Sequence, residues 1–340
     1  MKRRTSAAVD TPADPFRERG ATTLRWRTRV LGAQITFESN SAELLALARE
    51  AFDRVPAHRW ARGDTALTVT LMLARDAPGA RWAYPPEPLL GSGGGLLTSH
   101  VDAANFAVIS PGRSHALVQV TPRMLRHRRL LRYEFIEFAA LTLAARVQRL
   151  VPLHAGCVGA RGRGVLLLGG SGAGKSTLAL HAALAGLEFL AEDSLFLQPG
   201  SLAATGLPAF VHARAGSLGL VAAGPERRSL ARAPRIRRRS GAAKLEIDLR
   251  RGAARLAARP LRIVATLVLS AAKARGGPRL SPLPAARLRR ILRAGQAYAV
   301  QQPGWREFER RLVRAGGYLL SRAPPAAGVT ALRNLLANAP

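Results

Sequence analysis

Cysteine is nearly absent from this chain, whose 340 residues include a single one, Cys157. One cysteine excludes an internal disulfide framework and a zinc site built from several cysteines, and it favours a reducing compartment. Long apolar runs are also missing, because the best candidate, "IVATLVLSAA", is too short to span a bilayer. The charged N-terminus has no apolar stretch behind its basic residues, unlike a secretory signal. The sequence therefore predicts a soluble cytoplasmic protein with no membrane partner.

Acidic residues and lysines are scarce as well. The chain has 21 Asp and Glu against 52 Lys and Arg, a formal net charge of +31, and only four of these basic residues are lysines. Such a surface attracts nucleic acid or acidic proteins. The densest basic run, residues 227–244, has no aromatic residue for base stacking. We expect solvated surface and a loop there, with an acidic partner as the second alternative and nucleic acid as the least favoured.

The order of patterns along the chain predicts an α/β protein with two folded parts. We expect a disordered tail at residues 1–20 and a small α/β domain at residues 21–125. A basic amphipathic helix at residues 126–150 connects this domain to a catalytic domain at residues 151–325, and a C-terminal helix or tail at 326–340 follows. In the N-terminal domain, Asn40 is the predicted N-cap of an amphipathic helix.

The strongest motif is G-x-x-x-x-G-K-[ST], which Gly169, Gly174, Lys175 and Ser176 satisfy. The apolar "GVLLL" before it reads as a buried strand, and "KSTLALHAALA" after it reads as a helix closed by Gly186. In such a loop, backbone N–H groups donate to phosphate oxygens, the positive helix end attracts them, and glycines let the backbone approach closely.

This motif predicts ATP and Mg²⁺ as cofactors. We expect Lys175 to bridge the β- and γ-phosphates and Ser176 to bind Mg²⁺. The predicted ATP-binding residues are Gly169, Gly170, Ser171, Gly172, Ala173, Gly174, Lys175, Ser176 and Thr177.

Two acidic residues, Glu192 and Asp193, end the next apolar segment, "LEFLAEDS". A strand, helix, strand unit with so short a return usually makes its two strands parallel neighbours that finish at one sheet edge. Both carboxylates should then lie beside the loop, where they can hold a metal or accept a hydroxyl proton. Ser176, Glu192 and Asp193 are the predicted metal ligands.

A histidine before the loop belongs to the same predicted site. The apolar segments on either side of "RGRG" predict a hairpin in which Ala160 faces Arg163 and Val158 faces Val165. Continued further, this register sets His154 opposite Gly169, at the mouth of the loop. There the imidazole can contact the γ-phosphate or orient the carboxylate. The predicted catalytic residues are thus Asp193, His154 and Lys175.

His154, Gly156, "GVLLLGGSGAGKS", Gly186 and the "AED" ending at Asp193 resemble the HPr kinase/phosphorylase family and its HPr-kinase-related branch. That family shares the fold of phosphoenolpyruvate carboxykinase. The resemblance covers residues 152–198 most specifically. It implies a bacterial, ATP-dependent kinase that phosphorylates a serine hydroxyl, with Asp193 as the base and with Lys175, Ser176 and His154 around the phosphates.

The chain departs from this family pattern at two places. Glu192 stands where the family usually has Asp, and residues 205–217 contain no carboxylate where the family has a glutamate segment. We expect phosphate transfer to a hydroxyl of a protein or peptide, with a homo-oligomer also open. A nucleotide-binding regulatory module with little turnover and a nucleic-acid-associated P-loop ATPase remain alternatives. The choice of acceptor depends on segments such as residues 199–244, and these carry no motif that would identify the acceptor.

Overall fold

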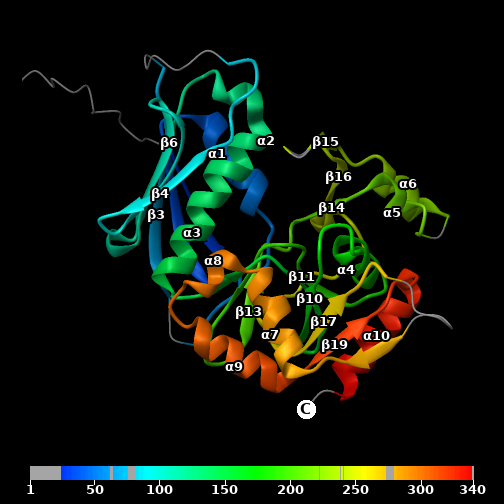
Figure 1. The fold of residues 1–340 in the computed structure, drawn as a ribbon. Helices are drawn as coiled ribbons and strands as arrows, with labels where there is room; N and C mark the ends of the chain where they lie inside the picture. Colours follow the sequence, from blue (N-terminus) through cyan, green and yellow to red (C-terminus); the bar gives the residue numbers. More distant parts are fainter. Residues whose placement is uncertain are drawn as a thin grey trace, which may run out of the picture.

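The structure is a computed structural model with a mixed α/β fold and several sheets (Figure 1). It describes residues 24–61, 64–75, 82–221, 223–237, 239, 241–272 and 279–338. The predicted tail at residues 1–20 lies outside these ranges.

The first seven strands form one sheet in the order β1-β2-β3-β7-β6-β5-β4. Strand β3 pairs in parallel with β2 and with β7, and the other neighbours are antiparallel. Alternate side chains of the inner strands are buried, as expected for strands with one face on a core. The strands are β1 (Leu24–Val30), β2 (Ala33–Ser39), β3 (Ala66–Leu73), β4 (Leu89–Gly93), β5 (Leu96–Asp102), β6 (Asn105–Ser110) and β7 (His115–Val120).

Helices α1 (Ala42–Phe52) and α3 (Phe138–Val147) lie along one face of this sheet (Figure 1). Ser41, and not the predicted Asn40, caps α1, because its hydroxyl accepts from Leu44 N while the Asn40 amide bonds the backbone of Leu73. Three short segments lead into α3. They are η2 (Met124–His127), α2 (Arg128–Leu130) and the π-helical η3 (Leu131–Glu137). A separate short helix, η1 (Pro111–Arg113), lies between β6 and β7.

The second sheet has the order β11-β9-β10-β17-β13-β12-β8, and in addition β19 pairs with the C-terminal half of β17 and β18 pairs with β19. Its central strands β10, β17 and β19 are parallel. The strands are β8 (Val151–Leu153), β9 (Gly156–Ala160), β10 (Arg163–Leu168), β11 (Glu188–Ala191), β12 (Leu195–Leu197), β13 (Ala203–Gly206), β17 (Leu261–Leu269), β18 (Leu280–Pro282) and β19 (Gly317–Leu320).

Helices cover both faces of the second sheet, which makes this part a three-layer structure. Helices α4 (Lys175–Leu184) and α10 (Pro325–Asn338) pack together on one face, over β9 and β10. Helices α7 (Ala285–Ala294) and α9 (Trp305–Ala315) cover the other face, with α8 (Ala297–Val300) between them. Their apolar side chains form two cores, one on each side of the sheet.

The hairpin expectation is confirmed, while the expected strand neighbours are wrong. Ala160 pairs with Arg163 and Val158 with Val165, as predicted. However, β11 pairs with β9 and not with β10, because the hairpin partner β9 already occupies that edge of β10. Both β10 and β11 run antiparallel to β9 and therefore parallel to each other. They still end at the same edge of the sheet, so Glu192 and Asp193 lie beside the glycine-rich loop, as predicted.

A third sheet, in the order β14-β16-β15, stands beside helices α5 and α6 (Figure 1). It corrects the expectation of a loop at residues 227–244, since this range holds most of α6, all of β15 and the start of β16. The elements of this region are β14 (Phe210–Ala213), α5 (Ala215–Leu218), α6 (Pro225–Ala231), β15 (Arg235–Arg237), β16 (Ala243–Asp248) and η4 (Leu249–Arg251).

In the part of the chain that the structure describes, every helix is too short or too polar to span a membrane.

Candidate functional site

A cavity of about 840 Å³ opens where β10 passes into α4, and we call it the loop cavity. It brings together residues from seven separate stretches of the chain. The lining includes His154, Gly169, Gly172, Gly174, Lys175, Ser176, Glu192, Asp193, His212, Lys244 and Gln296. All three predicted catalytic residues and all three predicted metal ligands therefore line one cavity.

The backbone of residues 169–174 forms a tight loop around the start of α4. Gly172 and Gly174 have φ values of 79° and 101°, which L-residues with side chains rarely adopt. A Cβ at either position would meet no other atom within 4 Å, so both glycines border open space. The loop therefore needs glycine for its conformation, and it leaves room for a ligand close to its backbone.

Lys175 is the first residue of α4, and its Nζ donates to the Gly169 carbonyl at 2.6 Å across the loop. Burial and the nearby Lys244 lower the pKa of the Lys175 ammonium, although Asp193 and Glu192 oppose this. A half-buried cation at the N-terminus of a helix is a favourable partner for phosphate oxygens. The predicted ATP-binding residue Thr177 also has a partner, since its Oγ1 lies 2.9 Å from Ser217 Oγ.

Glu192 follows the end of β11 and is only 5% exposed. Its Oε1 accepts from Ser176 Oγ at 2.5 Å, and its Oε2 accepts from the backbone N–H of His212 at 2.7 Å. Burial alone would raise the pKa of Glu192, but the hydrogen bonds and charge of His212, with the Ser176 bond, hold it below its usual value. The carboxylate is thus ionised, fixed in place and tied to the loop.

Asp193 comes next in the chain and is less buried than Glu192. Its Oδ1 accepts from Ser194 Oγ at 3.1 Å. Glu192, Asp193 and His212 each offer one ligand atom, and these atoms lie within 4.8 Å of one another. Among the described residues, this is a group of side chains that could hold a cation. Two of its members agree with the sequence prediction, and His212 is new.

His154 lies between β8 and β9 and is exposed at the mouth of the loop cavity. Gln296, between α7 and α8, bonds both backbone groups of this residue. Its Oε1 accepts from His154 N at 2.8 Å, and its Nε2 donates to His154 O at 3.0 Å. The side chain of Gln296 thereby fixes the backbone and leaves the imidazole at the cavity. Nothing in the sequence pointed to Gln296.

His212 is the main residue that sequence reasoning missed. It lies on β14, inside the segment 205–217 that lacks a carboxylate, and its Nδ1 is 3.1 Å from Glu192 Oε2. Its Nε2 is 2.7 Å from the Tyr133 hydroxyl, which also donates to Glu246 Oε2 at 2.7 Å. Strand pairing sets Glu246 of β16 opposite His212, so a distant strand brings a carboxylate to this place.

A buried ionic cluster backs this arrangement from the side of η3. Arg132 is fully buried and pairs with Glu50, with Glu137 at 3.2 Å and with Glu246 at 2.8 Å. Burial raises the pKa of Glu137 to about 8, with Arg132 opposing this and Glu246 adding to it. We call Arg132, Tyr133, Glu137, His212 and Glu246 the shared wall, because its His212 lines the loop cavity and its Tyr133 lines a second pocket.

Comparisons with known proteins add no assignment for this chain. No protein-family model matches the sequence, and no curated protein matches it either.

Proposed function

We propose that this protein is a cytoplasmic, ATP-dependent kinase of the HPr-kinase-related type that transfers the γ-phosphate to a hydroxyl, typically a serine, of a protein or peptide. The observation that carries the proposal is the convergence of the Gly169–Ser176 loop, Glu192, Asp193 and His154 on one cavity. A cation-bearing loop at a helix N-terminus favours phosphate, and a carboxylate beside it can accept a hydroxyl proton. Phosphoryl transfer uses both.

The donors around the loop fit Mg²⁺, which prefers oxygen ligands. Ser176, Glu192 and Asp193 supply a hydroxyl and two carboxylates within one cavity, and these residues would hold the ion. When bound with ATP, Mg²⁺ would neutralise charge on the β- and γ-phosphate oxygens.

The roles of the side chains follow from their contacts. The Lys175 ammonium would pair with phosphate oxygens, and the N–H groups of the loop would donate hydrogen bonds to the other phosphate oxygens. Glu192 already has both of its oxygens occupied, so it would orient Ser176 rather than take a proton. Asp193 would accept the proton of the acceptor hydroxyl as that oxygen attacks the γ-phosphorus, while the bond between the γ-phosphorus and the bridging oxygen breaks and ADP leaves.

The experiment that tests this function is single-turnover transfer of labelled γ-phosphate, to a co-encoded peptide or protein first and then to water. Asp193→Asn keeps the shape of the side chain but removes the base. We expect nearly intact ATP binding and a transfer rate lower by about 10²- to 10⁴-fold. His154→Ala should lower the rate less, because orienting a group is not the proton transfer itself.

Equal transfer rates in the wild type and in Asp193→Asn would remove this residue from the chemistry. If no acceptor is phosphorylated and Asp193→Asn leaves a slow ATP hydrolysis unchanged, a regulatory nucleotide-binding module becomes the better account. Sequence-selective DNA binding that persists at physiological salt would instead favour a nucleic-acid-associated ATPase.

A further inference from the structure

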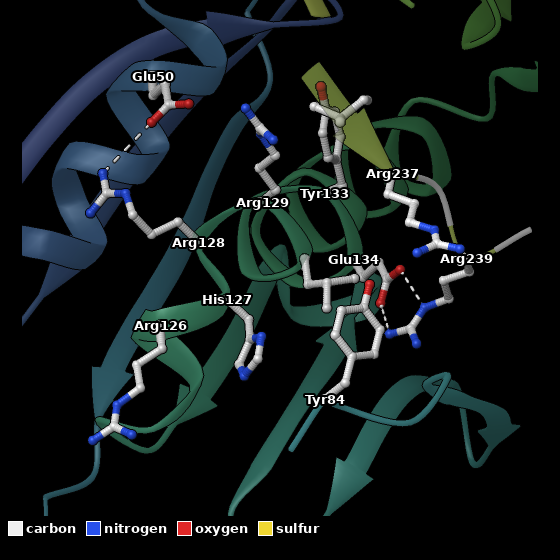
Figure 2. A pocket seen from close by; sticks show the side chains of 12 residues that line it. Glu50, Tyr84, Arg126, His127, Arg128, Arg129, Tyr133, Glu134, Arg237 and Arg239 are labelled. Atoms are coloured by element: carbon white, nitrogen blue, oxygen red, sulfur yellow. Dashed lines mark hydrogen bonds and ion pairs between the residues drawn. The ribbon is translucent and has the colours of Figure 1, made fainter. Parts of the chain in front are cut away.

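A second pocket, of about 740 Å³, is lined in part by Tyr133 of the shared wall (Figure 2). Five arginines line it, and we call it the arginine pocket. Three come from the turns before η3, and two come from β15 and the residues after it, so distant stretches of the chain meet here. The arginines are Arg126, Arg128, Arg129, Arg237 and Arg239.

The pocket keeps a cationic excess after its internal ion pairs are counted. Glu134 pairs with Arg239 at 2.6 Å, and Glu50 pairs with Arg128 at 3.7 Å. Within the part of the chain that the structure describes, neither Arg126 nor Arg237 has a carboxylate at ion-pair distance, and both are exposed. These two guanidinium groups are therefore available to an anion. Planar guanidinium forks match carboxylates in two-point geometry.

Apolar and aromatic side chains complete the pocket. Tyr84 is 54% exposed, and its ring meets the His127 ring edge-on at a centroid distance of 5.7 Å. Leu130 and Ile236 also line the space. Burial, with the cations of Arg123 and Arg126, lowers the pKa of His127, which agrees with a positive field here. The pocket thus combines cations with an apolar surface, the features that recognise carboxylates next to a large apolar side chain.

Strand β15 borders the pocket and forms the edge of its sheet within the described residues. Glu246 N–H donates to the Pro234 carbonyl at 2.9 Å. Because antiparallel pairs alternate, Arg235 and Arg237 then direct their backbone groups away from β16. Arg129 already donates to the Arg235 carbonyl at 3.0 Å. An extended peptide beside this edge would find the backbone groups of Arg237.

We propose that the arginine pocket binds an acidic, apolar-containing peptide segment of the phosphate acceptor, away from the hydroxyl that is phosphorylated. The edge of β15, where the backbone groups of Arg237 point away from β16, can pair with an extended peptide, so an acidic peptide fits better than nucleic acid. Tyr133 lines this pocket while its hydroxyl contacts His212 of the loop cavity. A segment docked here lies next to the loop cavity and leaves the rest of the partner to reach Asp193. The identification of this partner as the phosphate acceptor rests on the proposed function, whereas the binding site itself does not.

The test is fluorescence anisotropy with a fluorescein-labelled peptide that carries several glutamates around one leucine and one phenylalanine. We expect Arg126→Glu with Arg237→Glu to weaken its binding by about tenfold or more, because two attractive contacts become repulsive. The matched control is Arg306→Glu with Arg310→Glu, two exposed arginines of α9 with the same change in net charge. This control should bind the peptide nearly as tightly as the wild type. Tyr84→Ala, a second pocket variant, should weaken binding without changing the charge.

Equal losses in the pocket variant and the α9 control would show attraction to net charge alone and would overturn the proposal. So would unchanged affinity in the pocket variant, or equal binding of a peptide with glutamine in place of glutamate. Tighter binding of a labelled oligothymidine, lost in the same pocket variant, would replace the peptide by nucleic acid. The binding measurement needs no turnover, so Asp193→Asn should bind the peptide as the wild type does. The peptide-binding result can therefore be interpreted even if the kinase proposal fails.

Discussion

The loop cavity and the arginine pocket have similar volumes, about 840 and 740 Å³, but they are assembled in different ways. The loop cavity is built around one continuous motif, whose glycines and lysine follow one another between β10 and α4. The arginine pocket has no motif, because its arginines come from η2 and α2 and from β15 and the residues just after it, about a hundred residues apart. Local patterns therefore indicate the first site, and only the tertiary fold shows the second.

The shared wall is the place where the two sites meet. On one side, His212 contacts Glu192 of the loop cavity, and on the other, Tyr133 faces the arginine pocket. Behind them, Arg132 contacts the carboxyl groups of Glu50, Glu137 and Glu246. Substitutions in this wall distinguish a purely structural role from an effect on the chemistry of the loop cavity.

The largest effect should come from Arg132→Met. This change removes the cation and leaves Glu137 and Glu246 buried beside each other, so the free energy of unfolding should fall by about 3 to 5 kcal/mol. Urea denaturation measures it, with the exposed Arg310→Met as the control. A loss no greater than that of the control would mean that the cluster contributes little to the fold.

Glu137→Gln should change the pH dependence of stability. A carboxyl group whose pKa is about 8 in the folded state keeps its proton there while the same group ionises in the unfolded chain, so the fold loses stability as pH rises from about 5 to 8. Relative to the wild type, the variant should gain stability over this window by at most about 1.4 kcal/mol per pH unit. Denaturation curves at several pH values measure the difference. Parallel curves would contradict the raised pKa.

The smallest effect should come from Tyr133→Phe, which removes only the hydroxyl between the two sites. Glu192 keeps its bonds from Ser176 and from His212 N, so phosphate transfer should fall by less than about tenfold. Single-turnover transfer measures it beside Asp193→Asn. A loss as large as that of Asp193→Asn would make Tyr133 part of the catalytic machinery rather than a structural element of the wall.

Sequence reasoning reached the elements that local chemistry determines. The turn at residues 160–163 fixes the register of the β9–β10 hairpin, and the predicted pairing of Val158 with Val165 is confirmed. The neighbour of β10 was predicted wrongly. A strand has two edges, and β9 and β17 occupy both edges of β10, so β11 pairs with the outer edge of β9 instead. The N-cap of α1 moved from Asn40 to Ser41 because a tertiary contact with Leu73 holds the asparagine.

The site was predicted in the same uneven way. Glu192, Asp193 and His154 could be expected beside the loop because strand ends at one sheet edge meet. His212, Glu246 and Gln296 could not, because they reach the site through strand and helix packing between distant stretches of the chain. A polar residue inside an apolar strand, such as His212 in β14, is the signal that could have identified one of them.

Binding of Mg·ATP by calorimetry tests the central claim most directly, namely that the Gly169–Ser176 loop holds a nucleotide. Lys175→Ala removes a charge-assisted contact to phosphate and should weaken binding by about 2 to 3 kcal/mol. Arg310→Ala, which removes an exposed cation on α9, is the control and should bind as the wild type does. We predict binding by the wild type and by this control, with a clear loss in Lys175→Ala. Equal affinity of the wild type and Lys175→Ala, or no binding by the wild type, would contradict the account.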